Sequence, residues 1–108
     1  MNKQINISVK DLKHGDYVYN IDGTSKGQFH YVSIFDKIDE DGKFCEIVSC
    51  VYEAPQDFDD TLDNLFYFTK NEIPTTLRLA SKNETRYLNA LLMDDGFSFK
   101  DGKLKKID

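Results

Sequence analysis

The chain has 108 residues, of which 40% are hydrophobic and 31% charged, and its formal net charge is −5. This length suits one domain with its own core, so we expect residues 1–108 to form a single domain and exclude a (β/α)8 barrel. Uniform nucleic-acid binding is disfavoured, because phosphate contacts need a basic surface. Apolar runs stay below the ~18 residues of a membrane helix, so we expect no membrane association.

The first predicted elements are two short strands. Alternating polar and apolar residues predict a strand over residues 5–9. A turn follows, in which Gly15 permits a tight bend into a strand over residues 17–21. Turn-forming residues then predict a loop over residues 22–27.

A long hairpin is predicted next. Residues 28–38 and 43–53 are rich in β-branched and aromatic side chains, and Asp39-Glu40-Asp41-Gly42 between them is a turn signal. Unbroken alternation divides the apolar side chains of the first arm between two faces, with Val32, Ile34 and Ile38 on one and Phe29, Tyr31 and Phe35 on the other. Both faces are therefore apolar, and the sheet is expected to be covered on both sides or to curl.

The two cysteines, Cys45 and Cys50, lie five residues apart in the second arm. Alternation places them on opposite faces, where they cannot pair with each other. Two unpaired thiols are typical of a reducing compartment, and the first eight residues lack the apolar stretch of a secretory signal. We therefore expect a cytoplasmic protein.

We expect neither cofactor nor metal. No glycine-rich phosphate-binding motif is present, and His14 and His30 are not at zinc-finger spacing. The aspartates over residues 57–63 resemble part of a calcium loop. However, Leu62 and Phe68 stand where that loop needs glycine and glutamate.

The sharpest candidate site joins an acidic loop to an aromatic strand. Residues 36–63 carry ten acids and two bases, residues 54–63 are predicted to be a loop, and residues 65–69 a strand. An acidic surface with exposed aromatic rings is typical of a protein-binding surface, although solvated turns and core packing explain the same residues. The residues expected to bind a partner are Asp57, Phe58, Asp59, Asp60, Phe66 and Tyr67.

The C-terminal third predicts a helix and a second hairpin. A short extended segment covers residues 77–79, and Ser81 and Glu84 form a capping box before a helix over residues 82–94. Its apolar side chains recur at helical spacing, at Tyr87, Leu88, Leu91 and Leu92. They are expected to face Val32, Ile34, Ile47 and Val51 or their opposite-face counterparts. Gly96 suits a left-handed helix end, and residues 97–100 and 103–107 then alternate as hairpin arms.

Residues 78–107 also carry a sequence pattern that runs through all of these elements. It consists of Arg78, Ala80-Ser81, Glu84, Leu88, Leu91, Gly96-Phe97, Phe99 and Lys103-Leu104-Lys105-Lys106-Ile107. It resembles the strand–helix–hairpin of small proteins from bacteriophages and mobile elements of gut bacteria. Serine replaces their usual threonine, and the two phenylalanines replace tyrosine and tryptophan. The resemblance implies a small intracellular accessory protein of phage or mobile-element origin, and it supplies no catalytic residues.

The fold class expected is α+β, with five or six antiparallel strands in a bent sheet or partial barrel and one helix packed on it. The residues favour a non-enzymatic module that binds a protein partner or itself. A nucleic-acid accessory protein using the basic C-terminal hairpin is one alternative. A small enzyme with a pocket that gathers His30 or Cys50 with a carboxylate is another.

Overall fold

The structure is a computed structural model, and it describes residues 7–24, 27–53 and 65–107. The fold is α+β, as predicted, with one α-helix and seven strands in this part of the chain. In chain order the elements are η1 (Val9–Asp11), β1 (Tyr17–Thr24), β2 (Gly27–Ile38), β3 (Phe44–Glu53), β4 (Leu65–Asn71), β5 (Arg78–Leu79), α1 (Lys82–Asp94), β6 (Phe97–Lys100) and β7 (Lys103–Lys106).

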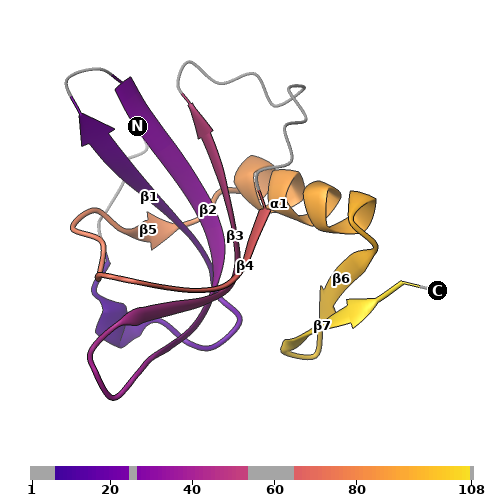
Figure 1. The fold of residues 1–108 in the computed structure, drawn as a ribbon, viewed down its shortest axis with the longest axis horizontal. Helices are drawn as coiled ribbons and strands as arrows, with labels where there is room; N and C mark the ends of the chain where they lie inside the picture. Colours follow the sequence, from indigo (N-terminus) through magenta and orange to yellow (C-terminus); the bar gives the residue numbers. More distant parts are fainter. Residues whose placement is uncertain (1–6, 25–26, 54–64, 108) are drawn as a thin grey trace.

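Five strands form one antiparallel sheet in the order β4-β3-β2-β1-β5. The sheet is not closed into a barrel, and among the described strands β4 and β5 are its two edges. Strands β6 and β7 pair only with each other in the described chain. Figure 1 shows α1 and this small hairpin together beside the sheet, at the right of the view.

The predicted hairpin of β2 and β3 is confirmed, and Asp39 builds its turn. The Asp39 carboxylate accepts hydrogen bonds from the backbone N–H groups of Asp41 and Lys43, each with a nitrogen–oxygen distance of 2.9 Å. Gly42 adopts a φ of +76°, a conformation that glycine reaches at little cost. A side chain that satisfies turn amides in this way explains why this acidic stretch reverses the chain.

The predicted strand over residues 5–9 is wrong where the structure describes it, from Ile7 onward. The Ser8 hydroxyl accepts a hydrogen bond from the Lys10 amide over 3.2 Å and starts the single turn of η1. Local bonds of this kind compete with a strand ladder. The Ile7 amide instead donates to the Leu77 carbonyl over 2.8 Å, which ties the N-terminal segment to the residues before β5.

The alternation of β2 and β3 breaks where the register shifts. Ile47 has no partner in β2, and Asp36 has none in β3, so each is an extra residue. An extra residue reverses which face the following side chains occupy. Ile38 consequently packs with the Phe35 cluster, and its predicted place beside Val32 and Ile34 is wrong. β3 turns sharply along its length in Figure 1, as expected of a bulged strand.

The same shift removes the basis for placing Cys45 and Cys50 on opposite faces. Both thiols are buried and free, as expected. Their separation has a simpler cause, because five residues of strand span ~16 Å. A disulfide needs Cα atoms within about 7 Å. Burial raises the pKa of the Cys50 thiol to about 12, so this thiol is protonated at neutral pH and unreactive.

Two apolar clusters cover the two faces of the sheet. The first joins the predicted side chains of α1 to the sheet, with Cys50 in the cluster in place of the predicted Val51. Its buried members are Tyr19, Val32, Ile34, Ile47, Val48, Cys50, Tyr87, Leu88, Leu91 and Leu92. The second lies beneath the N-terminal segment and consists of Leu12, Val18, Phe35, Phe44 and Leu77. Both faces are therefore covered, as the two apolar faces of the long hairpin predicted.

The small C-terminal hairpin is fastened to the sheet by rings and by His14. Phe99 meets the Tyr17 ring edge-on at 6.2 Å between centroids, and Phe97 lies 5.7 Å from the Tyr67 ring. The His14 ring lies between the two units, with Nε2 2.8 Å from the Gly102 carbonyl oxygen and Nδ1 3.0 Å from Asp36 Oδ1. His14 therefore links the turn of the hairpin to the bulge of β2.

Candidate functional site

The structure describes only two of the six residues that are predicted to bind a partner. Asp57, Phe58, Asp59 and Asp60 lie outside the described residues. Phe66 and Tyr67 lie on β4, the edge strand, where neighbouring side chains point to opposite faces.

Phe66 and Tyr67 have different surroundings. Phe66 is 50% exposed, as a partner-binding ring should be. Tyr67 turns inward, packs against the first cluster, and its hydroxyl donates to the Asp95 carboxylate. Tyr67 therefore holds β4 against the end of α1, and its ring does not share a surface with Phe66.

Phe68 is the residue that the sequence reasoning missed. Its side chain is 79% exposed and its φ is +54°, in the left-handed region that favours glycine. The register pairs Tyr67 with Val48 and Thr69 with Glu46, so Phe68 lies opposite the extra residue Ile47. Such a conformation costs about 1–3 kcal/mol and is concentrated at functional sites. The signal in the sequence was the run Phe66-Tyr67-Phe68, which leaves at least one ring outside the core.

The edge of β4 is open to a further strand. In the part of the chain that the structure describes, β4 pairs with β3 alone. The outer backbone groups of an edge strand form a template on which an extended peptide can pair. Two exposed rings therefore lie on a strand edge that can also offer main-chain hydrogen bonds.

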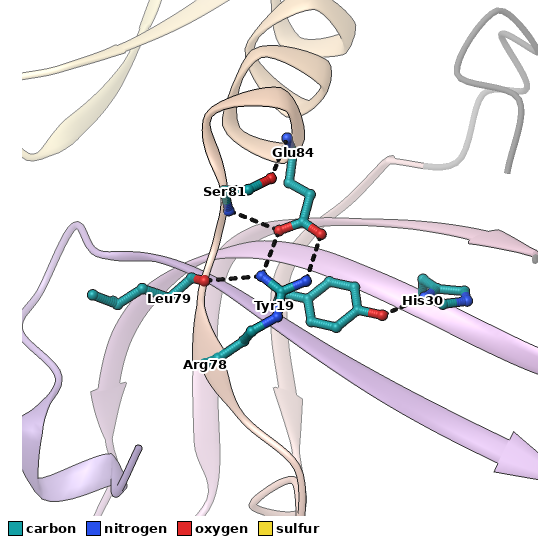
Figure 2. A network of polar contacts seen from close by, with 6 residues as sticks. All are labelled: Tyr19, His30, Arg78, Leu79, Ser81 and Glu84. Atoms are coloured by element: carbon teal, nitrogen blue, oxygen red, sulfur yellow. Dashed lines mark hydrogen bonds and ion pairs between the residues drawn. The ribbon is translucent and has the colours of Figure 1, made fainter. Parts of the chain in front are cut away.

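A polar network joins the start of α1 to β1 and β2 (Figure 2). The Arg78 guanidinium donates two parallel hydrogen bonds of 2.8 Å to the Glu84 carboxylate. The Ser81 amide donates to the same carboxylate at a distance of 2.8 Å. The Ser81 hydroxyl accepts from the Glu84 amide over 3.2 Å, which confirms the predicted capping box. Burial raises the pKa of Glu84, but Arg78 and Ser81 outweigh that effect and hold the pKa below its ordinary value.

The network continues from Arg78 to His30. The Arg78 guanidinium lies 3.8 Å from the centre of the Tyr19 ring, and the Tyr19 hydroxyl bonds His30 Nδ1. Burial, as the largest influence, lowers the pKa of His30. Because both Glu84 oxygens are engaged and the carboxylate is ionised, it is not poised to accept a substrate proton. The network fits a structural role, fastening the helix to the sheet.

The pKa values of the two histidines are shifted in opposite directions, so the two residues are expected to have opposite effects on how stability depends on pH. The Gly102 carbonyl, foremost, and Asp36 raise the pKa of His14, whereas burial lowers that of His30. Protonated His14 thus supports the fold below the unfolded pKa of about 6.5, and this support is lost as the pH rises through the folded pKa. Neutral His30 supports the fold above about 6.5, and this support is lost as the pH falls toward the lowered value.

Urea unfolding between about pH 5 and pH 8 measures both effects. We expect His14→Gln to remove the loss on the alkaline side and His30→Gln to remove the loss on the acidic side. The quantity to compare is the slope of the free energy of unfolding against pH. The free energy itself also changes in His30→Gln, because that variant disturbs the bond with Tyr19. Unchanged slopes in both variants would show that neither imidazole is linked to folding.

A cavity of about 320 Å³ lies beneath the chain that crosses from β4 to β5. These strands are opposite edges of the sheet, so residues 72–77 must span the face away from α1. Lys43 Nζ forms an ion pair with Glu72 Oε2 at 2.5 Å, and the Thr76 hydroxyl donates to the Ile21 carbonyl oxygen at 3.2 Å. Neither His30 nor Cys50 is among the lining residues, which are Asn20, Ile21, Tyr31, Phe44, Glu46, Asn71, Glu72, Ile73, Pro74 and Thr75.

The fold and its surfaces define a class: an α+β protein with an open five-stranded antiparallel sheet and an exposed aromatic edge. Comparison with protein-family models, curated proteins and solved structures finds no match to this chain. The resemblance of residues 78–107 to phage and mobile-element proteins therefore stays a prediction. Among the described residues, no helix is long and apolar enough to cross a bilayer, and no three potential metal ligands gather.

Proposed function

We propose that this protein is a non-enzymatic interaction module of the cytoplasm, which binds an extended segment of a protein partner along the outer edge of β4. The observation that carries the proposal is Phe68, an aromatic ring left 79% exposed on a backbone with φ +54°. Glycine or asparagine would relieve that conformation. A bulky apolar residue kept there in contact with water is therefore best explained by a partner that covers it.

The partner's chemistry follows from charge and from the strand edge. Residues 36–63 carry ten acids and two bases, so a basic segment would be steered toward this region. Main-chain pairing with β4 would supply affinity, and contacts with the exposed rings of Phe66 and Phe68 would supply specificity. The basic C-terminal hairpin gives nucleic acid less support, since Asp101 partners Lys105 at 3.4 Å. An origin in a phage or mobile element belongs to the same proposal and is supported by residues 78–107 alone.

The test is a selection of random displayed peptides on the immobilised wild-type protein, followed by fluorescence anisotropy with each enriched peptide. We expect Phe68→Gly to weaken binding at least ~10-fold, because a central aromatic contact is a typical hot spot. The same change should leave stability unchanged or raise it by up to about 1 kcal/mol, because it relieves the positive φ. Loss of binding could then not be blamed on unfolding.

Leu79→Ala is the matched control. Leu79 is 54% exposed on β5, the opposite edge of the same sheet, so this change should leave the affinity unaltered. Charge reversal at Asp59 and Asp60 should weaken binding and flatten its salt dependence. If affinity and salt dependence survive the reversal, the acidic loop has no part in binding. If the selection yields nothing, or if Phe68→Gly binds as the wild type does, the β4 proposal is wrong.

A further inference from the structure

The cavity beneath residues 72–77 contains a buried carboxyl group that forms no ion pair with any residue the structure describes. Glu46 is 4% exposed. Its Oε1 accepts from the Thr69 hydroxyl over 2.6 Å and from the Asn71 amide over 2.9 Å. Neither donor is a cation, and across the described residues no lysine, arginine or histidine forms an ion pair with Glu46. Buried carboxylates are normally paired with a cation, so Glu46 is an exception that needs a reason.

Two lysines that lie close to Glu46, one along the chain and one across the strand pairing, are engaged elsewhere. Lys43 pairs with Glu72 over 2.5 Å, and Lys70 pairs with Asp39 over 2.6 Å. Both hydrogen bonds to Glu46 end on Oε1, so Oε2 accepts no bond from a described residue. A positive group that entered the cavity would therefore meet a carboxylate oxygen with its accepting capacity intact.

The walls of the cavity indicate the rest of the ligand. Phe44, Ile73 and Pro74 supply apolar surface, while Asn20 and Tyr31 add polar groups and a ring. The volume of about 320 Å³ lies at the lower end of the ~300–1,000 Å³ that is usual for small-molecule pockets. Such a space suits a short chain or a single ring, with the charge at the Glu46 end.

We propose that this cavity binds a protonated amine or guanidinium on a short apolar stem, with the cation on Glu46 and the stem against Phe44, Ile73 and Pro74. The cavity reaches Asn71 at the end of β4, but neither Phe66 nor Phe68 lines it, and the proposal does not depend on the proposed partner. Two sources share this chemistry: a free small amine, and a lysine or arginine side chain of a peptide.

Titration of the full chain followed by amide NMR shifts tests the proposal. The probes are butylamine for a free amine and Nα-acetyl-lysine N-methylamide for a peptide side chain, with 1-butanol as the neutral control. We expect at least one amine to bind and to shift residues around Glu46, and 1-butanol to bind at least ~10-fold more weakly. Binding of butylamine alone identifies the free amine as the ligand, and binding of the lysine derivative identifies a peptide side chain.

Glu46→Gln keeps the shape and can still accept from Thr69 and Asn71, and it should weaken amine binding at least ~10-fold. Glu40→Gln is the matched control, because Glu40 is exposed in the turn between β2 and β3, does not line the cavity and should matter by no more than ~3-fold. Ile73→Trp changes a partly exposed lining residue and should block entry even if Glu46→Gln folds poorly. The proposal is overturned if neither amine binds, or if binding is unaffected by Glu46→Gln and Ile73→Trp.

Discussion

Removing either partner of the Arg78–Glu84 ion pair is expected to lower the free energy of unfolding by about 3–5 kcal/mol. The side chains are only 16% and 10% exposed, and their two hydrogen bonds are parallel. Arg78→Met would leave the Glu84 carboxylate buried without its cation. Glu84→Gln would leave the guanidinium equally uncompensated while keeping an oxygen for the Ser81 amide.

A double-mutant cycle measured by urea unfolding separates the pair from its surroundings. We expect the variant that carries both Arg78→Met and Glu84→Gln to be destabilised by clearly less than the sum of the single changes. The reason is that much of each single loss comes from stranding the other charge. Additive losses would show that the two side chains act independently, contrary to the contacts in Figure 2.

Leu88→Ala is expected to cost about 2–5 kcal/mol, because it opens a cavity between α1 and the sheet. Leu88 is fully buried and belongs to the cluster that contains Val32 and Ile34. The neighbouring strands are tied into the sheet ladder, so we expect them to collapse only partly into the space.

Met93→Ala on the same helix is the control for Leu88→Ala. Met93 is largely exposed, so its loss should change stability by no more than about 0.5 kcal/mol. Thermal and urea unfolding of both variants measure the difference. Equal, small losses at the two positions would mean that the helix does not pack on the sheet through Leu88.

The elements that the sequence predicted well are those that local signals define. The helix over residues 82–94 agrees with α1 because the capping box and Gly96 mark its two ends within a few residues. The hairpin of β2 and β3 agrees with the prediction because its turn is formed by local contacts: hydrogen bonds to the Asp39 carboxylate and the positive φ of Gly42. Whether the sheet closes into a barrel depends on which strands end as edges, and no local signal carries that.

Features that depend on distant residues were not predictable. The extra residues Asp36 and Ile47 exist only as a mismatch between two strands, and they moved Ile38 to the other face. At the candidate sites, the position of Phe68 opposite Ile47 and the lack of an ion pair between Glu46 and any described residue also depend on how distant strands meet. The run of aromatic residues pointed to the β4 region, and alternation separates Tyr67 from Phe66 and Phe68, but alternation could not show which of the two faces would be exposed.

We propose that β4 is the surface on which a partner binds. The most direct measurement is amide hydrogen exchange of the wild-type protein, alone and with the tightest peptide from the selection. Strand addition predicts that exchange slows at the amides of β4, with β5 and the C-terminal hairpin unchanged. Slower exchange at β5 or at the C-terminal hairpin, with β4 unaltered, would contradict the claim.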